Sequence, residues 1–249
     1  MKVRMYNVGF GDCFCLRDRK KSLLVDFGTN NSRIEGRPRR EIFDVIISDL
    51  STIKSKNLLL THFHMDHLSG LLYMMKKKDI SVDFGKIYLP DVFSKKEMSR
   101  TLVLLLLADL LKESGLPSRQ VSLFALVDAL LENKQNVELL SRGKLFENKY
   151  QALWPDTDVI RKETDEVYNR ICEDGKFKEV MDVLLEFAEK LRLIVWSMTA
   201  EGNKPAETVE KETDLTASEL TEQPEVRQKI IRAYVYEREF RRIKALPDF

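Results

Sequence analysis

All three histidines of this chain lie within one short segment, and this cluster limits the possible folds and functions more than any other feature. The segment runs Thr61-His62-Phe63-His64-Met65-Asp66-His67. It follows a short apolar run at 57–60, which predicts a buried strand, and it leads into a helical pattern at 65–77. Imidazole and carboxylate groups are the ligands that Zn²⁺ and similar divalent ions prefer. The cluster therefore predicts a metal site at the end of a buried strand.

The order of these ligands indicates how they divide between two ions. His62 and His64 alternate at a strand end, so both side chains can converge on one ion. Asp66 and His67 open the following helix, where they can reach a second ion roughly 3.5–4 Å away. Such ions lower the pKa of a bound water and polarise a phosphoryl or carbonyl oxygen. Asp66 is then either a ligand or the carboxylate that orients this water, and Thr61 is expected to make only a local hydrogen bond.

The composition describes a globular chain without a strong charge preference. Its 249 residues include 41 basic and 40 acidic side chains, so no global attraction to nucleic acid is expected. The longest apolar run, at 102–111, includes an Asp and is too short to cross a bilayer, which needs about 20 residues. Cys13, Cys15 and Cys172 are odd in number and predict no disulfide framework. We therefore expect a cytoplasmic protein without a membrane segment, in which Cys13 and Cys15 are buried.

Two regions of different character make up most of the chain. Residues 1–95 alternate between strand and helix patterns. The expected strands lie at 3–8, 13–16, 22–26, 57–60 and 86–89, and the expected helices lie at 40–50 and 65–77. Residues 96–198 are mainly helical, at 98–112, 121–133 and 176–196, with a candidate return strand near 144–155. This order predicts an α/β fold, an α+β sandwich with an added helical region.

Two further segments follow residue 198. Residues 199–226 are acidic, Thr-rich and poor in large apolar side chains, so we expect a flexible linker. Residues 227–249 again show a helical pattern, with a basic face that includes Arg238, Arg241 and Arg242. We expect this face to be solvated, with binding of an acidic group or another subunit as the alternative.

Four motifs of the chain resemble those of the metallo-β-lactamase superfamily. The strand, the Thr-His-x-His-x-Asp-His string and the helix resemble its metal-binding signature. Val25-Asp26-Phe27-Gly28-Thr29 is similar to its first motif, in which the residue matching Asp26 supports the metal loop and is not itself a ligand. Asn7-Val8-Gly9-Phe10-Gly11-Asp12-Cys13 resembles the glycine loop of one branch, with Asp12 as a further supporting residue. Ala152-Leu153-Trp154-Pro155 looks like a strand end found midway through such domains.

The resemblance implies a fold and an activity. The fold is an αββα sandwich, of which residues 1–95 would supply only the first half. The branch includes the hydrolase domain of the bacterial DNA-uptake channel and related phosphodiesterases and nucleases, which implies a bacterial phosphodiesterase or nuclease. The implied cofactors are two divalent ions, zinc first and manganese as the alternative. Hydrolysis of a thioester or lactam ranks lower, because only the glycine loop bears on the substrate.

The resemblance also assigns the site residues. The metal ligands are His62, His64, Asp66 and His67, and Asp66 is also the candidate catalytic carboxylate. The second half of such a domain would bring further histidines and a bridging Asp, but the chain has no histidine after His67. Asp156, Asp158 and Asp214 match those ligands by residue type alone. The chain therefore stops before the second half, or another polypeptide supplies that half, or the site is degenerate; we favour the first two.

Two questions stay open at this stage. One is the function, because an interaction subunit with little or no catalysis, binding a protein partner through its helical region, is the alternative to a hydrolase of phosphodiesters or nucleic acid. The other is the substrate contact. Arg33, Arg37, Arg39 and Arg40 either flank the metal site and bind phosphate or form a solvated loop. The run Lys76-Lys77-Lys78 is explained more simply by its place at a helix end, so no substrate-binding residue is assigned.

Overall fold

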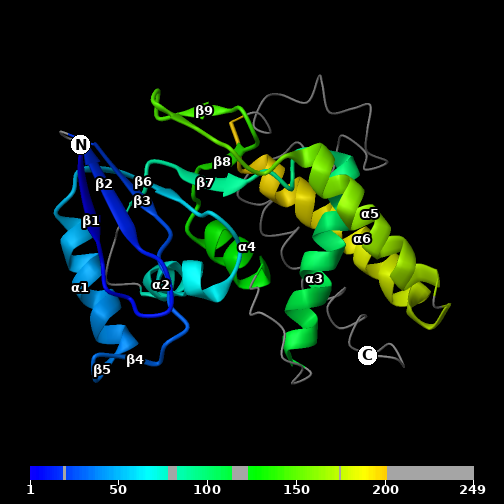
Figure 1. Ribbon diagram of the computed structural model, residues 1–249, viewed down its shortest axis with the longest axis horizontal. Coiled ribbons are helices and arrows are strands. Elements are labelled where there is room, and N and C mark those ends of the chain that lie inside the picture. Colours follow the sequence, from blue (N-terminus) through cyan, green and yellow to red (C-terminus); the bar gives the residue numbers. More distant parts are fainter. Residues whose placement is uncertain (19–20, 78–82, 114–122, 174, 201–249) are drawn as a thin grey trace. The chain divides into compact units, whose positions relative to one another are not determined.

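The computed structural model in Figure 1 describes residues 1–18, 21–77, 83–113, 123–173 and 175–200 as a mixed α/β fold. These residues form two compact units. The first contains Met1–Asp91 and Leu105–Asp156, and the second contains Val92–Leu104 and the residues from Thr157 onward. The first unit therefore includes residues that the sequence assigned to a helical insertion. Of the predicted linker at 199–226 only the first two residues are described, and the predicted helix at 227–249 lies outside the described residues.

The first unit is built on a six-stranded sheet in the order β1-β2-β3-β6-β7-β8. From β1 to β3 the strands are antiparallel, whereas β3, β6, β7 and β8 are parallel. The strands are β1 (Lys2–Met5), β2 (Phe14–Asp18), β3 (Lys21–Val25), β6 (Ser55–Leu59), β7 (Ile87–Pro90) and β8 (Val137–Leu140). The first five correspond to the five predicted strands, and a small hairpin, β4 (Arg33–Ile34) and β5 (Arg37–Pro38), follows β3.

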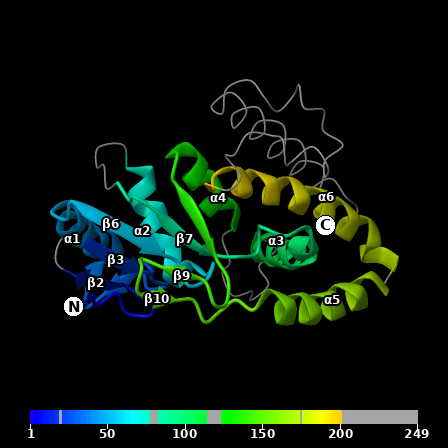
Figure 2. The ribbon, with the colours of Figure 1, turned by 90° about the horizontal axis from the view of Figure 1, so that it is seen from above.

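Helices cover one face of this sheet (Figure 2). They are α1 (Arg39–Ser51), α2 (Met65–Lys76) and α4 (Leu123–Glu132), with α2 in contact with both others. One cross-strand row on this face is fully buried and consists of Cys15, Leu24, Leu58 and Ile87. Cys13 and Cys15 are buried and free, as predicted.

A short hairpin packs on the opposite face (Figure 2). It consists of β9 (Leu145–Phe146) and β10 (Tyr150–Gln151), which form a separate two-stranded sheet. Phe146 clusters with Leu23, Tyr88 and Leu140 of the main sheet. The strand predicted near 144–155 therefore does not return to the main sheet, and β8 takes that place. The apolar side chains of this segment lie on the face of the sheet and do not extend it.

The second unit is helical. Its elements are a 3-10 turn, η1 (Lys96–Met98), the first residues of α3 (Ser99–Glu113), α5 (Thr157–Glu173) and α6 (Gly175–Ser197). Two of these, α3 and α6, correspond to predicted helices. The sequence did not predict α5, a polar helix whose buried residue is Tyr168. Arg100 holds α5 to α3 through its ion pair with Asp165 at 2.9 Å. None of the described helices has the length and apolar character needed to cross a bilayer.

Candidate metal centre

The histidine cluster lies at the carboxyl ends of two neighbouring parallel strands. β3 and β6 pair with Val25 opposite Leu59, so the chain leaves both strands at one edge of the sheet. Asp26 follows β3, and the segment 61–64 follows β6. His64 is the N-cap of α2, with an extended backbone at φ −77° and ψ 150°. This change of direction places Asp66 and His67 in the first turn of the helix, beside the residues that leave the strands.

Asp26 is the buried centre of this arrangement, with 2% of its surface exposed. One carboxylate oxygen accepts a hydrogen bond from the backbone N–H of Thr61 at 2.8 Å. The other accepts from the Thr61 hydroxyl at 2.7 Å and lies 2.9 Å from Nδ1 of His67. The backbone of Asp26 has φ 54°, a left-handed conformation that Asp tolerates better than most residues. Asp26 therefore joins the end of β3 to both ends of the histidine segment.

This bond fixes which nitrogen of His67 faces the cluster. A carboxylate can only accept hydrogen bonds, so Nδ1 of His67 carries the hydrogen and donates it to Asp26. Nε2 is the nitrogen left for other partners, and it lies 3.9 Å from Oδ1 of Asp66. Such a carboxylate behind the imidazole is the usual support of a metal-binding histidine.

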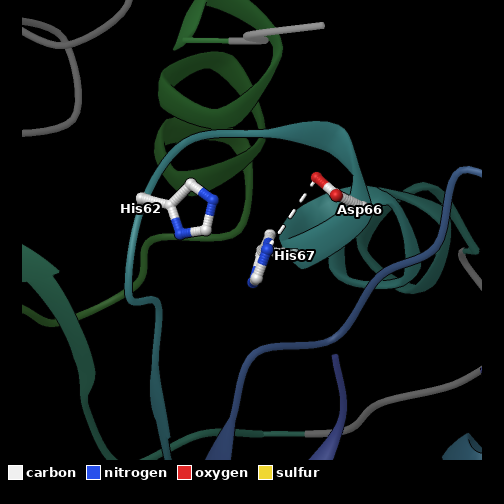
Figure 3. A group of neighbouring side chains, drawn as sticks. All are labelled: His62, Asp66 and His67. Carbon is white, nitrogen blue, oxygen red and sulfur yellow. Dashed lines mark ion pairs between the residues drawn. The ribbon is translucent and has the colours of Figure 1, made fainter. Parts of the chain in front are cut away.

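Two groups of side chains in the described residues bring candidate ligand atoms within 4.8 Å of one another. The first consists of His62, Asp66 and His67, and the second of Asp12, Asp26 and His67. Figure 3 shows the His62 ring beside His67 and Asp66, which project from the start of α2. The His62 and His67 ring centroids are 3.7 Å apart. A set of imidazole and carboxylate donors at this separation suits a borderline-soft divalent ion.

His64 lies beside this first group and is not a member of it. Its ring centroid is 4.7 Å from that of His62, and the two rings meet edge to face. The sequence had paired His62 with His64 on one ion and Asp66 with His67 on a second. The structure instead brings His62 together with Asp66 and His67, with His64 adjacent.

The two partly buried imidazoles differ in proton affinity. Burial, followed by repulsion from His67 and His64, lowers the pKa of His62 below its ordinary value of 6.5. Burial also acts to lower the pKa of His67, but the hydrogen bond to Asp26 and the charges of Asp26, Asp66 and Asp12 outweigh it. The net effect raises the pKa of His67 above 6.5. Because a metal binds the neutral imidazole, this raised pKa means that protons compete more strongly with an ion for His67.

The glycine loop between β1 and β2 places Asp12 against the same helix turn. The N–H of Asp12 donates to the carbonyl oxygen of Asp66 at 3.2 Å, and its carboxylate lies 3.7 Å from Nδ1 of His67. Gly11 makes this approach possible, because a Cβ there would lie 2.7 Å from the carbonyl oxygen of Asp66. Asp12 and Asp26 thus both border His67.

The remaining predicted residues lie elsewhere. The four arginines at 33, 37, 39 and 40 are exposed on the β4–β5 hairpin and the start of α1. Lys77 pairs with Asp44 of α1 at 2.6 Å, and Lys78 is outside the described residues. Asp156 accepts from Arg142 at 2.9 Å, and Asp214 and the basic face at 238–242 are also outside the described residues.

The roles of two residues near the site were not predicted from the sequence. Thr61 was expected to bond only locally, whereas it holds both oxygens of Asp26, 35 residues earlier. Ser69 of α2 accepts from the N–H of Thr29 and donates to its carbonyl oxygen, both at 2.9 Å. Both bonds depend on which strand lies beside which, and Ser69 has no local pattern that could reveal its role.

Comparisons with known proteins find a family match that spans this site. Residues 6–91 match the model of the metallo-beta-lactamase superfamily, and this range contains Asp12, Asp26 and the whole histidine cluster. Over 77 residues the chain is 32% identical to Endoribonuclease YSH1 of Mycosarcoma maydis. The match covers 31% of this chain and 8% of that protein. No solved structure matches the chain. The superfamily resemblance is confirmed for residues 6–91, and the described α/β fold is consistent with part of that fold.

Proposed function

We propose that this chain carries one wall of a two-metal site that hydrolyses phosphodiesters. The observation that carries the proposal is the group of His62, Asp66 and His67, supported from behind by the buried carboxylate of Asp26. Donors of this kind, held in place before an ion arrives, are what a hydrolytic metal site requires. The glycine loop further favours the branch that resembles the hydrolase domain of the DNA-uptake channel.

Each residue has a proposed role. His62, His64, Asp66 and His67 would together hold two ions, with zinc as the preferred metal and manganese as the alternative. When bound, such ions supply a water of near-neutral pKa and a positive charge beside the phosphoryl oxygen. Asp26 and Thr61 keep His67 in one orientation, and Asp12 borders it on the other side. Asp66 either binds an ion or orients the attacking water.

Nucleic acid is the substrate class that we favour. The superfamily includes nucleases, and the matched relative is an endoribonuclease. The four exposed arginines that follow the Asp26 motif could bind phosphate oxygens in pairs. The two buried free cysteines, Cys13 and Cys15, support a reducing compartment, the cytoplasm, as the site of action.

The test is metal content and turnover of bis-(p-nitrophenyl) phosphate by the natural full-length protein. We expect His64→Ala to reduce turnover by at least about tenfold, because the imidazole is a proposed ligand. Asp18→Asn is the matched control, since Asp18 lies on β2 and pairs with Lys149 at 2.8 Å, away from the cluster. Equal turnover in the wild type and His64→Ala would refute the proposal.

A second candidate is an interaction subunit that needs a further layer to complete the fold. The face of the sheet opposite α1 and α2 supports it, because Val3 and Met5 of β1 are apolar and 61% and 72% exposed. We propose that a partner with an apolar-faced sheet docks there, while this chain itself has little or no catalytic activity. This places the partner on the sheet and not on the helical region considered from the sequence.

The isolated chain distinguishes the two candidates. An interaction subunit should show little turnover in the 249-residue chain alone, in the natural full-length protein and with a partner. Tight zinc occupancy together with turnover by this chain would exclude the interaction subunit. Turnover that appears only in the natural full-length protein, or with a partner, would support the two-part site.

A further inference from the structure

Phe10 is the most exposed large apolar side chain of the described residues. Its exposed fraction is 80%, although phenylalanine is among the residues most often buried. It lies in the glycine loop between β1 and β2, flanked by Gly9 and Gly11. A single exposed apolar side chain needs no explanation by itself, so its setting decides whether it has a role.

The backbone that carries Phe10 is firmly held. Its N–H donates to Oδ1 of Asn31 at 2.7 Å. Its carbonyl oxygen accepts from the N–H of Asn30 at 2.8 Å and from the hydroxyl of Thr29 at 3.2 Å. Both polar groups of this peptide are therefore satisfied by the segment that follows Asp26. The ring is exposed on a loop with a defined position.

The same loop lies directly against the candidate metal centre. A Cβ on Gly11 would lie 2.7 Å from the carbonyl oxygen of Asp66, and Asp12 donates to that oxygen at 3.2 Å. Phe10 directly precedes Gly11, so its Cα lies about 3.8 Å from the Cα of the residue that makes this contact.

Exposed positive charge lies on the other side of the loop. A Cβ on Gly9 would lie 3.4 Å from Ile34, so the loop packs on the β4–β5 hairpin. Asn7 donates to Glu35 of the same hairpin at 2.8 Å. Arg33 and Arg37 of this hairpin are exposed. An exposed aromatic ring, on a loop that packs on a hairpin with exposed guanidinium groups, suits single-stranded nucleic acid, because bases stack on such a ring and phosphates pair with such cations.

We propose that Phe10 is a stacking platform for a base of single-stranded nucleic acid, with Arg33 and Arg37 on its phosphates. This inference rests on the proposed function, since it names the substrate form and the residue that would position it. The ring would stack on any base, so the platform confers a preference for unpaired strands and not for a sequence. Phe10 is a positioning residue, because it does not touch the reacting phosphate.

Binding without cleavage tests the platform separately from catalysis. The full 249-residue chain is titrated, with a chelator present, against a fluorescent single-stranded RNA and against an abasic strand of equal length. We expect the wild type to bind the base-bearing strand at least about fivefold more tightly than the abasic strand. Phe10→Ala should weaken binding of the base-bearing strand by about fivefold or more and leave the abasic strand unchanged. Phe10→Trp should retain the preference.

The controls separate stacking from charge and from protein contact. Leu153→Ala removes an equally exposed apolar side chain, at 79%, and should change neither affinity. Arg33→Ala with Arg37→Ala should weaken both strands and reduce the salt dependence. Equal binding of both strands by the wild type, no binding of either, or an effect of Phe10→Ala on self-association alone would overturn the inference. If the wild type shows the base preference but no phosphodiester turnover, only the catalytic proposal is refuted.

Discussion

At the scale of single residues, Asp26 has the greatest influence on the candidate site. Its carboxylate accepts hydrogen bonds from Thr61 and His67, which are the two ends of the histidine segment. Asn is the informative replacement, because it also tolerates the left-handed backbone of this position. We expect Asp26→Asn to weaken zinc binding by about 10- to 100-fold, since the amide holds His67 less firmly and no longer supports it with charge. Competition with a chromogenic chelator measures this.

The control for this change is a carboxylate of similar chemistry outside the site. Asp18→Asn removes an ion pair with Lys149 on the surface and should leave zinc affinity unchanged. Equal zinc affinity in the wild type and Asp26→Asn would show that Asp26 stabilises the fold and does not contribute to metal binding.

The sequence predicted the candidate ligands at this scale but not the hydrogen bonds that hold them. His62, His64, Asp66 and His67 form a local string with a known chemistry. The bonds from Thr61 to Asp26 arise because β3 and β6 are parallel neighbours, which no local pattern specifies. The grouping of His62 with Asp66 and His67 has another cause that no local pattern specifies. The chain changes direction at the start of α2 and so brings these side chains together.

At the scale of elements, α2 and the segment that follows β3 approach so closely that only glycine fits between them. A Cβ on Gly70 of α2 would lie 2.5 Å from a ring carbon of Phe27, which is fully buried. Gly70→Ala should therefore lower the free energy of unfolding by about 1–3 kcal/mol, as urea denaturation would measure. Gly175→Ala, at the start of α6, has no neighbour within 4 Å and should not destabilise the fold. Equal stability of the two variants would contradict the close packing.

A second element contact predicts a pH dependence. Asp49 of α1 accepts hydrogen bonds from Arg4 at 2.8 Å, from Arg17 at 3.0 Å and from the hydroxyl of Tyr6. Burial acts to raise the pKa of Asp49, but the Tyr6 bond and the charges of Arg4 and Arg17 hold it below the ordinary value of 3.8. A carboxyl with a lowered pKa stabilises the fold above its unfolded pKa, and this stabilisation is lost as the pH falls through the folded value.

Asp49→Asn should remove this part of the pH dependence. The wild type should lose stability between about pH 5 and pH 2, and the variant should lose less over the same range. At neutral pH the variant should be less stable by about 1 kcal/mol, because the partners are partly exposed. Urea denaturation at both ends of this pH range measures the free energy of unfolding of the two proteins. If it changes equally with pH in both, Asp49 does not make the stabilising contact.

Regular elements were predicted where the pattern was long or strongly apolar, and missed where it was short or polar. α1, α2 and the parallel strands β3, β6 and β7 follow their patterns closely. β8 was missed because its four residues do not alternate regularly between polar and apolar side chains. α5 was missed because its exposed surface is charged. The apolar residues near 144–155 were placed in the sheet, since a hairpin that packs on a sheet alternates in the same way as a strand within it.

At the scale of the whole chain, the main sheet is covered unequally on its two faces. Helices bury the row that contains Cys15, Leu24 and Leu58. On the other face the β9–β10 hairpin packs near Leu23 and Tyr88, and Val3 and Met5 stay exposed. β1 is also an edge strand of the sheet, and an exposed apolar edge promotes association.

This uncovered face should make the isolated chain associate with itself when the proposed second layer is absent. We expect sedimentation velocity to show an apparent mass that rises with concentration in the wild type. Val3→Lys with Met5→Lys should keep the chain monomeric, because charge on an exposed edge opposes pairing. The free energy of unfolding should change by less than about 0.5 kcal/mol, since both side chains are exposed.

The matched control is Val45→Lys, which changes an apolar side chain on α1 that is 58% exposed. Because α1 covers the opposite face, this variant should associate as the wild type does. If the double variant also associates as the wild type does, this face does not mediate association. The proposal that a second sheet docks there would then be unsupported. Monomeric behaviour of the double variant alone would locate the docking surface on β1, and the same two lysines should then abolish turnover that depends on a partner.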